Sequence, residues 1–215
     1  MDILPAGVAT VILSAGRSSR MQTDSTTEPD PRQHKALQQF PRQSLIEVQI
    51  ETYLSAGVKL VYCVLGWGAE IIRQTIEPLP GVEIIINNDW PSGMFSSVRV
   101  GLMAAASARA IFLQPVDNPP PAREMIISLA ENCSQGIAQP TFRGRGGHPL
   151  CINDDIAKRI IARPLTDRLD RIIREELRST VKRVETDDER CLDNLNSPQD
   201  WEKYRENITR LPDNG

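Results

Sequence analysis

The chain has 215 residues, 40% of them hydrophobic, which is enough for one domain, or at most two, with a sizeable buried core. Its 28 acidic and 25 basic side chains give a net charge of −3, which excludes a large positive surface for nucleic acid or an anionic membrane. The first residues, MDILPAG, lack the features of a secretory signal and no apolar run is long enough to span a bilayer, so we expect a cytoplasmic protein.

Short β-branched runs alternate with helical patterns in the first half of the chain, as expected for parallel strands joined by crossover helices. Ser44 and Glu47 form a capping box that begins one helix, and Gly57 ends it. Two further helices are predicted, one through Ile71 and Ile72 and one from the segment NNDWPSGM to about Ala108. Strands are predicted at Val8–Leu13, Leu60–Leu65, Val82–Ile86 and Ala110–Leu113.

The second half is less regular. It contains a predicted helix near Ala122–Asn132, a strand at Gly136–Gln139, helical patterns at 154–162 and 168–177, a strand at Val181–Val184 and a last helix from Ser197. The pattern predicts an α/β fold with a mostly parallel sheet between two helical layers. The four cysteines are scattered without CxxC spacing, which favours buried free thiols over a disulfide or zinc site.

Three polar clusters, LSAGRSSRM, NNDWPSGMFSS and QPVDNPP, directly follow predicted strands. Ligands of such sheets bind at the carboxyl ends of the strands, so these clusters should meet at one site. The first is either a phosphate-binding loop, in which backbone amides, Ser18, Ser19 and Arg20 bind the anion, or an ordinary turn. Neither GxxxxGK[ST] nor GxGxxG with its acidic residue is present.

VILSAGRSSRM, followed by Lys35 in HKAL, resembles the N-terminal signature of the nucleotidyltransferases that include the molybdenum cofactor cytidylyltransferases and guanylyltransferases. NNDWPSGMFSSVRVGL, LQPVDNPP, RGRGGHPLCI and LDNLNSPQDW are similar to later segments of the cytidylyl branch, in the same order. The resemblance implies a single domain over 1–215 with the Rossmann-like fold of nucleotide-diphospho-sugar transferases. Its nucleotide-binding half would cover about 6–120 and its acceptor-binding half about 121–207.

The resemblance also implies a reaction, the transfer of CMP from CTP, or from another nucleoside triphosphate, to a molybdopterin-type acceptor with release of pyrophosphate. Arg20 and Lys35 would hold the triphosphate, and Asp117 and Asn196 would bind Mg²⁺, with Mn²⁺ as an alternative. The nucleotide-binding residues would be Leu13, Ser14, Ala15, Gly16, Ser18, Arg20, Lys35, Gly93 and Ser97. Such chemistry needs positioning and charge neutralisation more than covalent catalysis.

The sequence departs from the family pattern in several places. Asn194 and Asn196 replace two aspartates, with Asp193 displaced by one, so a metal would be held more weakly. Alternatively, Asp117 is only a turn residue, and Ser197 with the following Pro-Gln-Asp only begins a helix; the helix start is compatible with a metal site. Gln114 and Pro115 stand where the family has small residues.

The segment 22–34, QTDSTTEPDPRQH, lengthens the gap before Lys35 and has no apolar residue. We expect a surface loop that is either a lid over the nucleotide, a docking segment for a partner, or a tolerated insertion.

The base of the nucleotide substrate and the contacts to the acceptor are predicted from single residues. Ala15 stands where guanylyl enzymes have glycine and therefore favours CTP. His148, after Gly147, is expected to hydrogen-bond the acceptor, or else is an ordinary loop histidine. Trp90 could stack on a flat ring, or anchor a loop to the core. Three alternatives stay open: another phosphorylated acceptor such as a sugar or alcohol phosphate, a nucleotide-binding module without turnover, and a cofactor carrier for a molybdenum hydroxylase partner.

Overall fold

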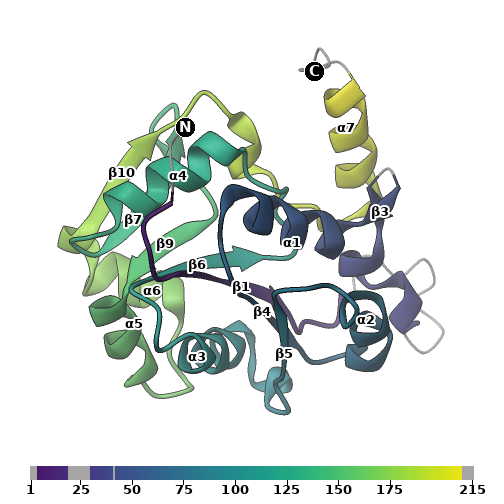
Figure 1. Ribbon diagram of the computed structural model, residues 1–215, viewed down its shortest axis with the longest axis horizontal. Coiled ribbons are helices and arrows are strands. Elements are labelled where there is room, and N and C mark those ends of the chain that lie inside the picture. The colour runs from purple at the N-terminus through teal and green to yellow at the C-terminus, as the bar shows by residue number, and fades with distance from the viewer. Residues whose placement is uncertain (1–3, 19–29, 41, 210–215) are drawn as a thin grey trace.

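The computed structural model describes residues 4–18, 30–40 and 42–209, with side chains as far as residue 206. Helices cover both faces of one central sheet (Figure 1), which confirms the predicted three-layer α/β fold. Within these residues, no helix is long and apolar enough to cross a membrane.

The sheet is built around β1, whose residues are all buried. In the described residues its strands run in the order β10-β7-β9-β6-β1-β4-β5, with β8 paired to β7. β1, β4, β5 and β6 are mutually parallel, whereas β9 is antiparallel to β6 and β7. The bounds are β1 Val8–Ser14, β4 Val61–Leu65, β5 Val82–Ile86, β6 Ala110–Pro115, β7 Ile137–Phe142, β8 Arg145–Gly146, β9 Leu150–Asn153 and β10 Val181–Glu185.

The helices divide between the two faces of the sheet. The helices α1 (Leu45–Ala56), α2 (Ala69–Ile76) and α4 (Arg123–Asn132) pack with Val8 and Ile12 of β1. The helices α3 (Met94–Ala104), α5 (Asp154–Ile161) and α6 (Leu169–Glu175) pack with Val11 and Leu13. Successive β1 side chains thus enter opposite cores, as the period of a strand requires.

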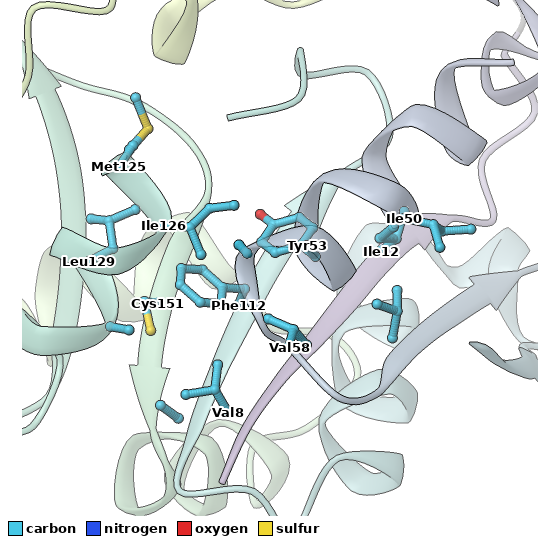
Figure 2. Close-up of a cluster of buried hydrophobic side chains, with 14 of the residues drawn as sticks. Val8, Ile12, Ile50, Tyr53, Val58, Phe112, Met125, Ile126, Leu129 and Cys151 are labelled. Carbon is cyan, nitrogen blue, oxygen red and sulfur yellow. The ribbon is translucent and has the colours of Figure 1, made fainter. Parts of the chain in front are cut away.

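Figure 2 shows the first of these cores, where the Tyr53 ring of α1 lies against Phe112 of β6 with ring centroids 5.4 Å apart. Cys151 of β9 belongs to the same cluster. All four cysteines are buried and free, which confirms the prediction made from their spacing.

The structure differs from the prediction at one strand that was not predicted and at several element ends; the strand predicted at Gly136–Gln139, for example, is β7, Ile137–Phe142. Strand β9 was not predicted, because four residues after Pro149 are too few to show a period. The helix expected to reach about Ala108 ends at Ala104. The alanine-rich run contains no stop signal; the Ala105 N–H still bonds Gly101, but the chain then turns to enter β6 at Ala110.

The shorter elements lie near the ends of the strands. α7 (Pro198–Thr209) begins at the predicted helix start, where Ser197 and Asp200 bond each other. The segment 22–34 was expected to be a surface loop, but His34 is only 1% exposed, and 22–29 lie outside the described residues. The remaining elements are β2 Gln39–Phe40, β3 Gln43–Ser44 and the 3₁₀ turns η2 Pro31–Gln33, η3 Lys35–Leu37, η4 Trp90–Ser92, η5 Arg178–Thr180 and η6 Glu189–Leu192.

Close approach of α3 to the sheet gives a stability prediction. A Cβ at Gly101 would overlap the side chain of Val11 and press on Val64. We expect Gly101→Ala to lower the free energy of unfolding by about 1–2 kcal/mol, because overpacking outweighs the gain in helix propensity. Met103→Ala, at a 58% exposed position of the same helix, is the control and should change it little. Denaturant unfolding measures both, and an equally stable Gly101→Ala variant would contradict the packing described.

Candidate active site

The loop that follows β1 has free space beside Gly16. Gly16 is exposed, and a Cβ there would meet no atom of the described residues within 4 Å. Ser18 has a left-handed backbone (φ 52°), uncommon for a residue with a side chain, and its Oγ accepts a 3.3 Å bond from the Lys35 N–H. The buried Ser14 Oγ has no hydrogen-bond partner among the described residues. The loop therefore leaves space for a ligand beside Gly16.

The residues that lead into this loop are fixed by backbone hydrogen bonds from neighbouring segments. The Val116 N–H donates to the Leu13 carbonyl and the Trp67 N–H to the Ala15 carbonyl, each at 3.1 Å. Ser19 and Arg20 lie outside the described residues, so the predicted triphosphate contact of Arg20 stays a prediction.

Lys35 lies between the two side chains predicted to bind metal. Its Nζ donates to Asp117 Oδ2 at 3.0 Å and to Asn196 Oδ1 at 2.8 Å. The Lys35 and Asp117 side chains are mostly buried, at 15% and 19% exposed. Leu13 of β1 pairs with Pro115 of β6, which brings the loops after both strands together. Three motifs far apart in the sequence therefore meet at one ammonium group.

Buried glutamines brace the loop that carries Asp117. Gln114 accepts a 2.9 Å bond from the Tyr53 hydroxyl, and its Nε2 donates to the Pro115 carbonyl at 2.9 Å. Gln49 Nε2, from α1, donates to the Asn118 carbonyl at 2.7 Å. The departure from the family at Gln114 thus has a structural reason, because the side chain links this loop to α1. Gln49 was missed, since a lone glutamine within a helical pattern gives no signal.

The C-terminal segment docks directly on the same loop. The Leu195 N–H donates to the Asp117 carbonyl at 2.7 Å, and Asn118 Nδ2 donates to the Asp193 carbonyl at 2.6 Å. Asn118 Nδ2 also lies 3.2 Å from Asn194 Oδ1. Of the two asparagines that replace aspartates, Asn196 therefore reaches Lys35, whereas Asn194 fixes the segment. The Asp193 side chain lines a separate pocket of about 260 Å³, and burial raises the pKa of its carboxyl.

The side chains around Lys35 provide only part of the ligands that a hard cation needs. The described residues hold no cluster of three His, Cys, Asp or Glu side chains that could bind a metal. Asp117 and Asn196 present two oxygen atoms, the ligand type that Mg²⁺ and Mn²⁺ prefer, but only one negative charge. Both oxygens are now bonded to Lys35. These two side chains would hold a divalent cation only with Lys35 moved away and with further oxygen ligands from phosphate and water.

The loop before α3 also has free space, beside Gly93. Gly93 has φ 103°, which favours glycine, and a Cβ there would meet no atom within 4 Å. Among the described residues no side chain caps α3, and the Ser96 N–H bonds the Gly93 carbonyl, which leaves the amides before Ser96 to contact an anion. Ser97 is only 4% exposed, and its Oγ accepts a 2.9 Å bond from Asn87 Nδ2. In this structure Ser97 steadies the loop; a base contact by this residue stays a prediction.

A cavity of about 760 Å³ begins at this loop. Apolar and polar side chains both line it, from η4, α3, β7, β9, α6 and the loop into α6: Ser92, Gly93, Met94, Phe95, Gln139, His148, Leu150, Leu165, Thr166, Asp167, Arg168, Leu169, Asp170, Ile173 and Arg174. Such a mixture can pack against the apolar part of a small molecule and hydrogen-bond its polar groups.

His148 is the predicted acceptor residue that lines this cavity. Its Nδ1 is buried without a partner among the described residues. Burial lowers the pKa of His148, while the charge of Asp117 acts in the opposite direction. Gly147 is buried, and a Cβ there would overlap the Cys191 backbone, so this glycine permits close chain approach. Trp90 packs against the core; the acceptor roles of Trp90 and Gly147 stay predictions.

His34 is the site-adjacent residue that sequence reasoning missed. Its ring is buried, and Nε2 lies 2.9 Å from the carbonyl oxygen of Gly16. Burial lowers the pKa of His34 to about 4, so the imidazole is neutral at pH 7. Its position directly before Lys35 was the available signal, but the polar run that precedes it made the whole segment look exposed.

Known proteins share this fold and part of this sequence. Nicotine blue oxidoreductase of Paenarthrobacter nicotinovorans is 35% identical over 114 residues, which are 52% of this chain and 50% of that protein. The match therefore spans half the length of that relative. A nucleotidyl transferase from Methanothermobacter superposes with a TM-score of 0.81 at 22% identity, over 96% of this chain and 99% of that one. A Mycobacterium tuberculosis protein solved in complex with manganese does so with 0.71 at 18%, over 96% and 100%.

The family match extends over most of the chain. Residues 10–182 match the MobA-like NTP transferase domain, from β1 to the start of β10. This range contains the loop after β1, Lys35, Asp117 and the cavity wall at His148. The resemblance inferred from the motifs is thereby confirmed: the chain belongs to the MobA-like NTP transferase domain family.

Proposed function

We propose that this protein transfers CMP from CTP to the phosphate of a molybdopterin-type acceptor and releases pyrophosphate. The observation that carries the proposal is the meeting of Lys35, Asp117 and Asn196 beside the open loop at Gly16. A cation, an anion and an amide oxygen held at the carboxyl ends of β1 and β6 provide the charge complement that a triphosphate and its metal require.

Lys35 has the central part in the proposed mechanism. Its ammonium group binds the triphosphate and stabilises the charge that develops on the leaving pyrophosphate, together with Arg20. The Gly16 loop and the first amides of α3 hold the nucleotide in place. An acceptor phosphate oxygen bonds to the α-phosphorus, the bond from that phosphorus to the oxygen bridging to the β-phosphorus breaks, and pyrophosphate leaves with the electron pair.

Asp117 and Asn196 would hold the divalent cation. When bound, Mg²⁺ or Mn²⁺ neutralises phosphate charge at the reacting centre. The relative from Mycobacterium tuberculosis that was solved with manganese supports a divalent metal in this fold. The buried Gln114 and Gln49 keep the Asp117 loop in one position, which limits the reorganisation needed at this centre.

The 760 Å³ cavity is the proposed acceptor site. Its apolar side chains, among them Phe95, Leu150 and Ile173, can pack against a flat ring system, and its polar side chains, among them His148, can contact the substituents of that ring. Ala15 supports CTP as the donor. In this proposal residues of about 6–120 bind the nucleotide, those of about 121–207 bind the acceptor, and a molybdenum hydroxylase would receive the product.

A second candidate is oxidation or reduction of an organic ligand in the same cavity, with a redox-active nucleotide as the electron acceptor or donor, as the name of the Paenarthrobacter relative suggests. It is favoured by the reduced negative charge at the metal position, where Asn196 stands in place of an aspartate. Such a protein would bind a nucleotide without releasing pyrophosphate.

Pyrophosphate release tests the proposal. CTP, GTP, ATP and UTP are offered in turn with Mg²⁺ or Mn²⁺, with molybdenum cofactor or a sugar phosphate as acceptor. We expect release with CTP that depends on molybdenum cofactor. Release with the sugar phosphate alone would move the function to another acceptor, and nucleotide binding without any release would contradict nucleotidyl transfer.

The charge of Asp117 should be essential for turnover. We expect Asp117→Asn to lower kcat/KM by about 10²–10³-fold, as for loss of one preorganised electrostatic contact at a reacting centre. Asp193→Asn is the matched control, because it also removes one carboxylate charge but at a residue that lines a separate pocket. We expect this variant to keep the wild-type kcat/KM. Steady-state kinetics at saturating metal decides, and wild-type turnover by Asp117→Asn would remove this carboxylate from the centre.

Lys35 should compete with the metal for the same two oxygens. Without nucleotide, we expect Lys35→Met to bind Mn²⁺ at least about tenfold more tightly than the wild type, because a positive charge 3.0 Å from Asp117 Oδ2 is removed. Lys35→Arg keeps a cation there and serves as the control. Electron paramagnetic resonance counts free Mn²⁺ directly, and equal affinities in all three proteins would place the metal elsewhere.

A further inference from the structure

The His34 ring joins two segments of the triphosphate site. Nε2 bonds the Gly16 carbonyl at 2.9 Å, across 18 positions of the chain, and Nδ1 accepts a 3.1 Å bond from the Ala36 N–H. The second bond caps η3, the turn that begins with Lys35. One side chain therefore fixes both the nucleotide loop and the backbone of the lysine that is proposed to bind the triphosphate.

These two bonds define one tautomer. The Gly16 carbonyl can only accept, so Nε2 must carry the proton, and the Ala36 N–H can only donate, so Nδ1 must be free of it. Burial keeps the ring neutral at pH 7 by lowering the pKa of His34 to about 4, and the nearby charge of Lys35 acts in the same direction.

The surroundings of the ring are built to hold it. Trp67 stacks on His34 with centroids 5.9 Å apart, and the Trp67 N–H bonds the Ala15 carbonyl at 3.1 Å. The Lys35 N–H reaches Ser18 Oγ at 3.3 Å. The loop after β1, the start of η3 and the segment after β4 thus form one connected unit in which His34 makes the central contacts.

We propose that His34 is a positioning residue for nucleotide binding: its imidazole, with the proton on Nε2, ties Gly16 to the turn that carries Lys35 and so sets where the lysine meets the triphosphate. The inference rests on the proposed function. The positioning role of His34 follows from the 18 positions of chain that separate it from Gly16. A connection of that length does not fix the distance between Lys35 and the Gly16 loop, so the His34 ring has to do so.

Two substitutions separate the two bonds of His34. His34→Asn keeps an acceptor where Nδ1 lies, and asparagine is a good N-cap, but it cannot reach Gly16. His34→Gln places an amide N–H near the position of Nε2 and gives up the cap. Asp30→Ala is the matched control, because it removes the cap of the neighbouring turn η2 without touching Gly16 or Lys35.

The experiment measures the Kd of CTP by calorimetry at pH 7.5, with the melting temperature of each variant and pyrophosphate release by the wild type. We expect a Kd about tenfold higher in His34→Asn, within about threefold of wild type in His34→Gln, and unchanged in Asp30→Ala. A merely structural role would lower the melting temperature and leave the Kd of the folded variants unchanged, and that result would overturn the proposal.

Nitrogen-15 NMR of the wild type gives an independent test that needs no variant to fold. The chain has two histidines, so the ring signals are few, and we expect His34 to show a protonated Nε2 and an unprotonated Nδ1 at pH 7. A proton on Nδ1, or an imidazolium, would overturn the inference.

The two proposals fail differently. Normal CTP affinity in His34→Asn, with wild-type pyrophosphate release, rejects the positioning role alone. Weakened CTP binding in His34→Asn, without pyrophosphate release by the wild type, rejects nucleotidyl transfer alone. A wild type that binds no CTP rejects both.

Discussion

The structure of the candidate site depends on one contact, the ammonium group of Lys35 between the oxygens of Asp117 and Asn196. These residues come from the loops after β1 and β6 and from the C-terminal segment, and each would be an isolated polar group if the others were absent. The sheet order explains why they meet, since the chain leaves β1 for β4 and β5 on one side and returns to β6 on the other. This reversal of direction leaves room for a ligand between the carboxyl ends of β1 and β6.

The same contact sets the electrostatic balance of the site. Asp117 supplies one negative charge and Lys35 one positive charge, so the pair is neutral before any substrate binds. In the proposed function, a triphosphate would attract Lys35 and leave the oxygens of Asp117 and Asn196 free to hold a divalent cation. Because Asn196 stands where the family has an aspartate, these side chains would bring less negative charge to the metal, and the nucleotide would have to contribute more.

The sequence predicted the elements that have strong local signals. A short stretch of sequence is enough to predict the buried β-branched strands, the helix starts at Ser44 and Ser197 and the glycine that ends α1. The antiparallel strand β9 escaped prediction because its four residues are defined by their partners β6 and β7 rather than by their own pattern.

The site was predicted only where the motifs were distinctive. Lys35, Asp117 and Asn196 were identified, and the structure brings them together. The supporting residues Gln49 and His34 were missed because their roles depend on tertiary contacts with Asn118 and Gly16. Ser97 bonds Asn87 and Trp90 packs on the core, as one of the two interpretations of Trp90 expected; the ligand contacts predicted for both residues stay predictions.

The most direct test of this account is a crystal structure of the protein with CTP and Mn²⁺, in which anomalous scattering locates the metal. We expect manganese bound to Asp117 and Asn196, with Lys35 moved to the triphosphate and the nucleotide lying over Gly16 and Gly93. Manganese and nucleotide bound elsewhere, with Lys35 still joined to both oxygens, would contradict it.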